Sequence, residues 1–224
     1  MLYVVTGANR GIGLELVRQI IDRGDQALGT ARDLARADEL KSSGARVLEL
    51  DVGDAGSVAS FAEKLRGTPV DVLINNSGIR NERDELDELD FEGIIRTFNV
   101  NALGALRVTH ALLPEIRRSS VKKIVMISSK MGSVADNGSG GSYGYRMSKA
   151  AMNMAARSLA RDLAGEGIIA VAMNPGWVRT DMGGGGAPAS VEDSARGILR
   201  QIDRLALGDS GEFVDYLGRG RVPW

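Results

Sequence analysis

Two side chains in the second half of the chain could carry out acid–base chemistry together. Tyr145 and Lys149 stand four residues apart in Y-R-M-S-K, a spacing that places the phenol and the ammonium on one face of a helix. A phenol with a pKa of about 10 is a poor acid or base at neutral pH. A cation beside it favours the phenolate, so we expect Lys149 to lower the pKa of Tyr145 toward the working range.

Several neighbours compete for roles beside this pair. Tyr143 has Met147 four residues later, so it lacks a helical lysine partner and is expected to be a loop or pocket aromatic. Ser128 ends an expected strand and Ser129 follows it, and strand alternation sends their side chains to opposite sides. His110, the one histidine, is expected to be a packed helix residue.

A glycine-rich loop, T-G-A-N-R-G-I-G at 6–13, joins the first expected strand to the first expected helix. Gly7 permits a tight turn, Gly11 lets the backbone approach a pyrophosphate, and Gly13 lets helix and strand pack closely. The helix N-terminus then offers free N–H groups and a positive dipole to phosphates. The loop therefore predicts a nucleotide site, with a purely structural turn as the alternative.

Two arginines bear on which nucleotide would bind. An acid about 18 residues after Gly13 would accept hydrogen bonds from the adenosine ribose and select NAD, but that position is Ala31. Arg32 follows directly, and Arg10 lies in the glycine loop. Guanidinium groups bind phosphate in a charged fork, which favours NADP(H) over NAD(H). In the alternative, both arginines are solvated and Asp33 contacts the ribose.

Composition narrows the class of protein. The chain has 224 residues, 43% hydrophobic and 25% charged, with a net charge of −1, which suits one globular domain and offers no pull toward nucleic acid or anionic membrane. It has no cysteine, so we expect neither thiolate zinc sites nor cysteine nucleophiles, and a single histidine predicts no metal site. No signal peptide or membrane span is visible, which predicts a cytoplasmic protein.

Short apolar runs alternate with helical stretches along the whole chain. The expected strands are 2–5, 26–30, 46–50, 72–75, 123–128 and 168–174, with a short one near 212–214. The expected helices are 11–23, 34–42, 57–66, 91–117, 145–165 and 190–205. Strands with little alternation are buried on both faces, so the pattern predicts an α/β fold: residues 1–224 form a single-domain doubly wound parallel sheet (Rossmann fold) of about seven strands with helices on both faces.

Three segments depart from this alternation. Asn81–Asp90 is acidic and is expected to be a solvated connection rather than an acidic docking site. Asp136–Gly144 and Gly183–Gly186 are glycine-rich and follow strand ends, where open α/β sheets bind ligands. They are expected to act as substrate lids, with plain connections as the alternative.

The motifs together resemble the short-chain dehydrogenase/reductase family. They are T-G-A-N-R-G-I-G, L-D-V at 50–52, N-N-S-G at 75–78, N-A-L-G at 101–104, S-S-K-M-G at 128–132, Y-R-M-S-K and N-P-G-W-V-R-T at 174–180. Their order and spacing match those of the family over nearly the whole chain. The stretch before Tyr145 and the ending P-G-W-V-R-T-D-M-G-G are similar to the sniffer-like and C-signal-like carbonyl reductase subgroup.

The resemblance implies roles for individual residues. A catalytic tetrad would comprise Asn101, Ser129, Tyr145 and Lys149. The residues expected to contact the cofactor are Gly7, Asn9, Arg10, Gly11, Ile12, Gly13, Arg32, Asp51, Val52, Asn76, Gly78, Tyr145, Lys149, Pro175, Gly176, Val178 and Thr180. The family's S-x-x-G pattern selects Ser129 over Ser128, and N-x-x-G selects Asn101 over Asn99. Asn101 could instead simply hydrogen-bond nearby backbone.

These roles imply an NADPH-dependent oxidoreductase that reduces an aldehyde or ketone, with Tyr145 as proton donor. Ser129 would bind the same oxygen, and Asn101 would hold a water that resupplies protons through Lys149. The alternatives are an alcohol dehydrogenase and an NAD(P)-sensing or signalling protein that acts through interaction rather than turnover. The small apolar faces of helices 91–117 and 145–165 suit a homodimer, unless they pack on the sheet.

Overall fold

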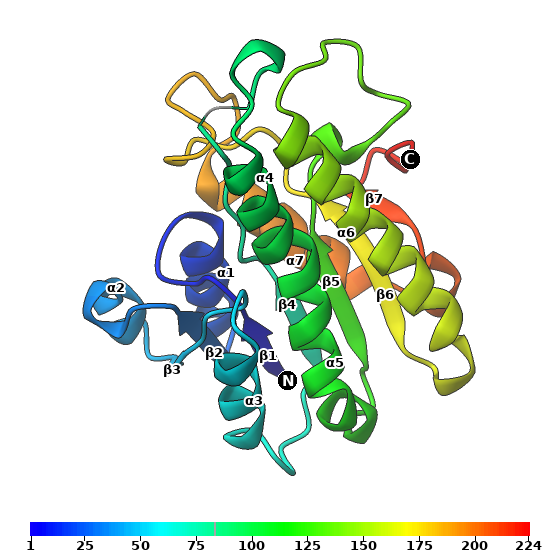
Figure 1. The fold of residues 1–224 in the computed structure, drawn as a ribbon. Helices are drawn as coiled ribbons and strands as arrows, with labels where there is room; N and C mark the ends of the chain where they lie inside the picture. The colour runs from blue at the N-terminus through cyan, green and yellow to red at the C-terminus, as the bar shows by residue number, and fades with distance from the viewer. Residues whose placement is uncertain (83) are drawn as a thin grey trace.

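A parallel seven-stranded sheet forms the centre of the molecule (Figure 1). The computed structural model describes residues 1–82 and 84–224. The strands are β1 (Leu2–Val5), β2 (Gln26–Ala31), β3 (Arg46–Glu49), β4 (Val72–Asn75), β5 (Lys123–Ile127), β6 (Ile169–Asn174) and β7 (Phe213–Asp215). Their order is β3-β2-β1-β4-β5-β6-β7, and every adjacent pair is parallel. The strand order reverses between β1 and β4, which is where open α/β sheets bind ligands.

Helices connect the strands and cover both faces of the sheet. They are α1 (Gly11–Asp22), α2 (Asp38–Lys41), α3 (Ala55–Glu63), α4 (Phe91–Phe98), α5 (Ala105–Arg118), α6 (Tyr143–Asp162) and α7 (Val191–Arg204). A π-helical segment, Asn99–Gly104, joins α4 to α5 without a break. The expected doubly wound fold is confirmed.

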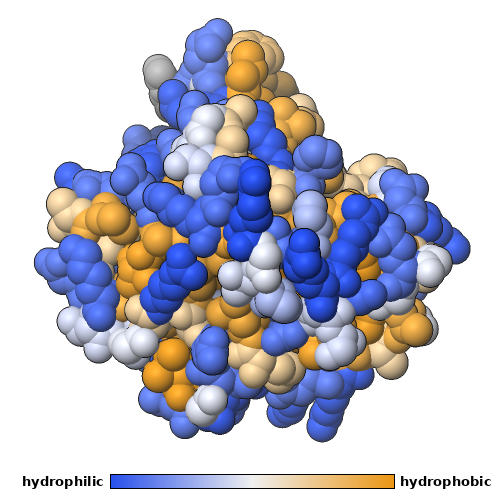
Figure 2. All heavy atoms as spheres, turned by 90° about the horizontal axis from the view of Figure 1, so that it is seen from below, coloured by the Kyte–Doolittle hydropathy of each residue, from blue (hydrophilic) through white to orange (hydrophobic). Residues whose placement is uncertain are grey.

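Each face of the sheet has its own hydrophobic core. Residues of α1 and α7 pack on one face, where Leu16, Ile20 and Ile198 are buried. Residues of α3, α5 and α6 pack on the other, around Phe61 and Leu112. Because both faces are covered, the strands are almost continuously apolar. The loops that follow the strands gather at one end of the molecule (Figure 1), and the opposite end carries interspersed hydrophilic and hydrophobic side chains (Figure 2).

The structure corrects several expected boundaries. The helix expected at 34–42 is a 3-10 turn, Leu34–Arg36, followed by the short α2. The helix expected at 91–117 is divided into α4, the π-helical segment and α5. α6 begins at Tyr143, so that residue opens the helix rather than lying in the preceding loop.

Candidate active site

The glycine-rich loop connects β1 to α1 with two residues in the left-handed region. Gly7 has φ +63° and Gly11 has φ +54°, conformations that side chains disfavour. A Cβ on Gly13 would lie 2.4 Å from the Gly7 carbonyl oxygen and 2.5 Å from Nδ2 of Asn76. That Nδ2 donates to the carbonyls of Thr6 and Gly7, both at 2.9 Å, so the Asn76 side chain fixes the shape of the loop.

The two arginines expected to bind phosphate differ in their surroundings. Arg10 forms an ion pair with Asp181, which lies in the loop after β6, and both side chains are exposed. Arg32 is exposed and has no hydrogen bond or ion pair with any residue that the structure describes. Asp33 caps a 3-10 turn by accepting from the Ala35 amide at 2.9 Å. This bond uses one oxygen of the carboxylate that was the alternative ribose ligand.

The remaining residues expected at the cofactor site lie around this loop. Asn9 Nδ2 donates to the Arg36 carbonyl at 3.4 Å, and Ile12 packs against the core. Past β3, Asp51 accepts from the Gly53 amide at 2.8 Å and Val52 is buried.

The loop after β6 contacts the glycine-rich loop. A Cβ on Gly11 would lie 3.5 Å from the methyl group of Thr180. Pro175 accepts from Ser194 Oγ at 2.7 Å, Gly176 has φ +87°, and Val178 is buried. The structure therefore brings Thr180, one of the residues expected at the nicotinamide end, against the glycine-rich loop expected to bind the phosphates.

Tyr145 and Lys149 lie together in the first turns of α6. The ammonium of Lys149 is 5.8 Å from the centroid of the Tyr145 ring and donates to the Ile127 carbonyl at 2.7 Å. Lys149 is buried, with 4% of its surface exposed. A Cβ on Gly78 would lie 3.6 Å from Nζ of Lys149, so the segment after β4 passes directly beside the ammonium.

The electrostatics of this pair differ from the expected ones. Burial raises the pKa of Tyr145, and the hydrogen bond with Ser129 and the positive charge of Arg80 lower it by less. Burial also lowers the pKa of Lys149 to about 8. The expectation that Lys149 brings the phenol pKa down is therefore wrong for this structure, because removal from water outweighs the neighbouring charges.

Ser128 and Ser129 point to different partners. Ser128 Oγ is buried and donates to Oδ1 of Asn153 at 2.5 Å. Ser129 Oγ accepts from the Met131 amide at 3.1 Å and interacts with the Tyr145 phenol. Ser129 is therefore the serine that the structure places beside Tyr145.

Asn101 lies in the π-helical segment and is fully buried. Its Oδ1 accepts from the Ile79 amide at 2.8 Å, and its Nδ2 donates to the Ile79 carbonyl at 2.9 Å and to Ser148 Oγ at 3.0 Å. The side chain thus ties the segment after β4 to α6. Asn99 instead donates to the Gly53 carbonyl at 3.1 Å, on the side of β3.

Sequence reasoning missed two residues that bear on Tyr145. Asp84 lies in the acidic segment and Arg80 directly precedes that segment. Asp84 is buried, and its carboxylate accepts from the amides of Gly144 and Tyr145 at 2.6 and 3.0 Å. Arg80 donates to Ser142 Oγ at 2.8 Å and acts on Tyr145 through its charge. The expectation of a solvated connection is therefore wrong for Asp84. The sequence alone does not show which acid in an acidic segment is buried.

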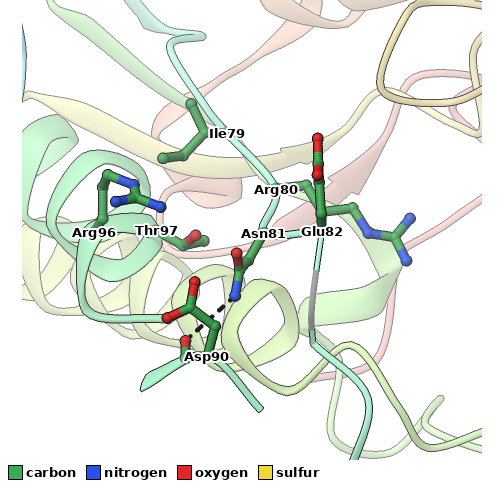
Figure 3. Close-up of a pocket in the computed structure, with 7 residues that line it drawn as sticks. All are labelled: Ile79, Arg80, Asn81, Glu82, Asp90, Arg96 and Thr97. Atoms are coloured by element: carbon green, nitrogen blue, oxygen red, sulfur yellow. Dashed lines mark hydrogen bonds between the residues drawn. The ribbon is translucent and has the colours of Figure 1, made fainter. Parts of the chain in front are cut away.

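A polar cavity of about 270 Å³ opens beside the same segment (Figure 3). It is lined by Ile79, Arg80, Asn81, Glu82, Asp90, Arg96 and Thr97. Nδ2 of Asn81 donates to the Asp90 carbonyl at 3.3 Å across one side of it. The Arg80 guanidinium points away from Arg96 and Thr97 in Figure 3.

The two glycine-rich loops expected to act as lids are both tethered. Arg146 donates to the Gly140 and Gly141 carbonyls at 3.2 and 3.0 Å, which holds the loop before α6. Trp177 Nε1 donates to the Gly183 carbonyl at 2.8 Å in the loop after β6.

Within residues 1–82 and 84–224, none of the helices combines the length and the apolar character that a membrane span requires.

Comparisons with known proteins identify relatives of this chain by sequence and by structure. A sequence model described as short chain dehydrogenase matches residues 2–188. The chain is 50% identical over 165 residues to C-signal from Myxococcus xanthus, which covers 74% of this chain and 99% of that protein. The crystal structure of NADPH-bound carbonyl reductase from chicken fatty liver superposes with a TM-score of 0.93 at 32% identity, covering 99% and 98% of the two chains. Carbonyl reductase Sniffer of D. melanogaster gives 0.94 at 30%, covering 100% and 98%.

Proposed function

This chain belongs to the short-chain dehydrogenase/reductase family, and we propose that it uses NADPH to reduce an aldehyde or ketone to an alcohol. The observation that carries the proposal is the meeting of Tyr145, Ser129 and Lys149 beside a loop shaped for a dinucleotide. The similarity to two carbonyl reductases, one with NADPH bound, supports the same reaction class.

The chain's own residues would position and protonate the substrate. The Ser129 hydroxyl and the Tyr145 phenol bind the carbonyl oxygen, and the phenol gives its proton to that oxygen as negative charge develops there. Burial raises the pKa of Tyr145, so the phenol carries its proton at neutral pH, while the hydrogen bond with Ser129 and the charge of Arg80 partly offset the rise and favour loss of that proton. A bound nicotinamide cofactor supplies the hydride. Lys149 would bind the ribose beside it, and a water near Asn101 would return protons through Lys149.

The residues present fit NADPH. Arg32 is an exposed guanidinium with no partner in the described part of the chain, beside a position where Ala31 replaces the NAD-selecting acid. The glycine-rich loop packs so closely around Gly13 that a side chain at this position would clash with its backbone. We expect Arg32→Ala to weaken NADPH binding about tenfold and to leave NADH binding unchanged. Fluorescence titration with both nucleotides checks this, and an equal loss for both would refute the role of Arg32.

The reaction is tested with a panel of aldehydes, ketones and quinones, following NADPH oxidation. The wild-type protein should reduce at least one of these compounds. Tyr145→Phe should abolish that reduction while NADPH affinity stays nearly unchanged, because the ring remains and only the proton donor is lost. Tyr143→Phe is the matched control. It removes the hydroxyl of a tyrosine only two residues away that has no lysine four residues later. Turnover by Tyr145→Phe would exclude the phenol as the acid.

A second candidate is a signalling protein that binds NAD(P) and acts through interaction. The observation in its favour is the 50% identity to C-signal. No reduction of any panel compound by a protein that still binds NADPH would favour this candidate.

We also propose that the protein is a homodimer through α4–α5 and α6. These helices pack against each other and carry large hydrophobic side chains on their exposed surfaces. Those side chains are Phe91, Ile95, Leu103, Leu106, Tyr143, Met147 and Met154. We call this set the helical apolar surface. Side chains of this kind left in water favour association with a second copy.

A further inference from the structure

The first turn of the catalytic helix is held by one residue from a distant part of the chain. The Asp84 carboxylate accepts from the amides of Gly144 and Tyr145, and its backbone carbonyl accepts from the Tyr143 amide at 3.1 Å. Only 2% of Asp84 is exposed. Three consecutive amides at the start of α6 therefore depend on a residue about 60 positions earlier.

α6 needs this outside partner because its own capping position does not provide one. The first N–H groups of a helix have no partner within the helix, and a side chain at the preceding position normally accepts from them. Ser142 occupies that position with φ +51° and makes no capping hydrogen bond within the described structure. Its hydroxyl instead accepts from Arg80 at 2.8 Å. Asp84 thus supplies the cap that Ser142 does not.

The fit around these amides is close. A Cβ on Gly144 would lie 2.8 Å from Ile94 of α4 and 3.1 Å from Oδ1 of Asp84. The helix start is therefore held between α4 and the segment after β4. Since Tyr145 is in this turn, its backbone position relative to Ser129 depends on the same contacts.

We propose that Asp84 is a positioning residue that fixes Tyr145 for proton transfer and sets the charge around its phenol; the proposal rests on the proposed reductase function. Three groups lie at the Tyr145 side chain: Ser129 hydrogen-bonds the phenol, Lys149 lies over the ring, and Arg80 adds a positive charge. The Asp84 carboxylate lies at the helix start, where it binds the backbone amide of Tyr145. An anion at a helix N-terminus offsets the positive end of the dipole. Loss of the Asp84 charge therefore favours the phenolate.

Two substitutions remove the Asp84 contacts to different extents. Asp84→Asn removes the charge and keeps one of the two acceptor oxygens, with an NH2 group in place of the other, and Asp84→Ala removes the charge and both acceptors. We expect kcat to fall roughly ten- to hundredfold in Asp84→Ala and by less in Asp84→Asn, with NADPH affinity unchanged. The alkaline limb of the kcat–pH profile should move to lower pH in Asp84→Asn, because the phenol loses its proton more readily. Asp87→Asn, an exposed acid in the same segment, should leave both readouts unchanged.

Hydrogen exchange tests the same contact without turnover. Amides in residues 143–150 should exchange at least tenfold faster in Asp84→Ala than in wild type or Asp87→Asn. Unchanged exchange, or an unshifted pH profile together with a kcat equal to that of Asp87→Asn, would overturn the positioning role. If the wild-type protein reduces no carbonyl, the proposed function fails, and faster exchange in Asp84→Ala would then establish a structural cap only, which also overturns the catalytic positioning.

Discussion

The burial of Lys149 has a cost that can be measured as stability. Its pKa falls from 10.5 to about 8, a difference worth about 3 kcal/mol when the ammonium is kept charged at neutral pH. Lys149→Met removes this charge with little change in volume but leaves the Ile127 carbonyl without its donor, which costs about 1 kcal/mol. We therefore expect Lys149→Met to raise the free energy of unfolding at pH 7 by about 1–2 kcal/mol while abolishing activity.

The sign of this effect depends on pH. Below about pH 8 both folded and unfolded wild-type chains carry the proton, so the full desolvation cost is present. Between that value and 10.5 the folded chain loses the proton first, and the advantage of Lys149→Met shrinks. Urea unfolding at pH 7 and pH 10 measures it, with the exposed Lys64→Met as control. A Lys149→Met chain no more stable than wild type at pH 7 would show that the burial penalty does not exceed the contribution of the lost hydrogen bond to Ile127.

The exposed ion pair between Arg10 and Asp181 should compete with the cofactor for the same guanidinium. If Arg10 binds the 2′-phosphate, Asp181→Asn frees it and should tighten NADPH binding by up to about fivefold, since such pairs contribute at most about 1 kcal/mol. NADH has no 2′-phosphate, so its affinity should not change. Fluorescence titration measures both, with Asp193→Asn as the control for losing an exposed ion pair elsewhere. Equal tightening of the two nucleotides would place Arg10 away from the 2′-phosphate.

At the scale of elements, the turn that carries Ser129 packs directly against α6. A Cβ on Gly132 would lie 2.8 Å from both C and Cβ of Lys149. Gly132→Ala should therefore push this turn away from α6, lower the free energy of unfolding by about 1–3 kcal/mol and reduce kcat more than it changes NADPH affinity. Gly138→Ala is a matched control in the following loop, where a Cβ meets nothing within 4 Å. Similar unfolding midpoints for the two variants would show that the turn can move without cost.

The regular elements could be predicted because their cause is local. β1 and β4 have the expected bounds, since a short apolar run between breaks is a sufficient signal for a buried strand. The π-helical segment Asn99–Gly104 could not be predicted, because the partners that Asn101 binds from it, Ile79 and Ser148, lie far away in the chain. The start of α6 was missed for the same reason: this helix begins earlier than expected because Asp84 caps it.

The candidate site was predictable where the interval between two residues determines that their side chains meet. The four-residue interval between Tyr145 and Lys149 places them on one helix face, and the structure keeps them there. The pKa of Tyr145 was not predictable, because it depends on how deeply the phenol is buried and on Arg80. Arg80 has no motif that marks it. Its effect appears only when the segment after β4 is placed against α6.

At the scale of the whole molecule, the helical apolar surface predicts the oligomeric state. Ile95 and Met147 are 61% and 51% exposed on α4 and α6, two helices that pack together. Light scattering after gel filtration should give a dimer for the wild-type chain. The double variant Ile95→Glu with Met147→Glu should give a monomer, because two new charges per subunit would be buried unpaired in the interface. Leu207→Glu, which charges a 60% exposed leucine in the turn before β7, should remain dimeric. A wild-type monomer would refute the interface. A dimer that survives the double variant would place the interface on another surface.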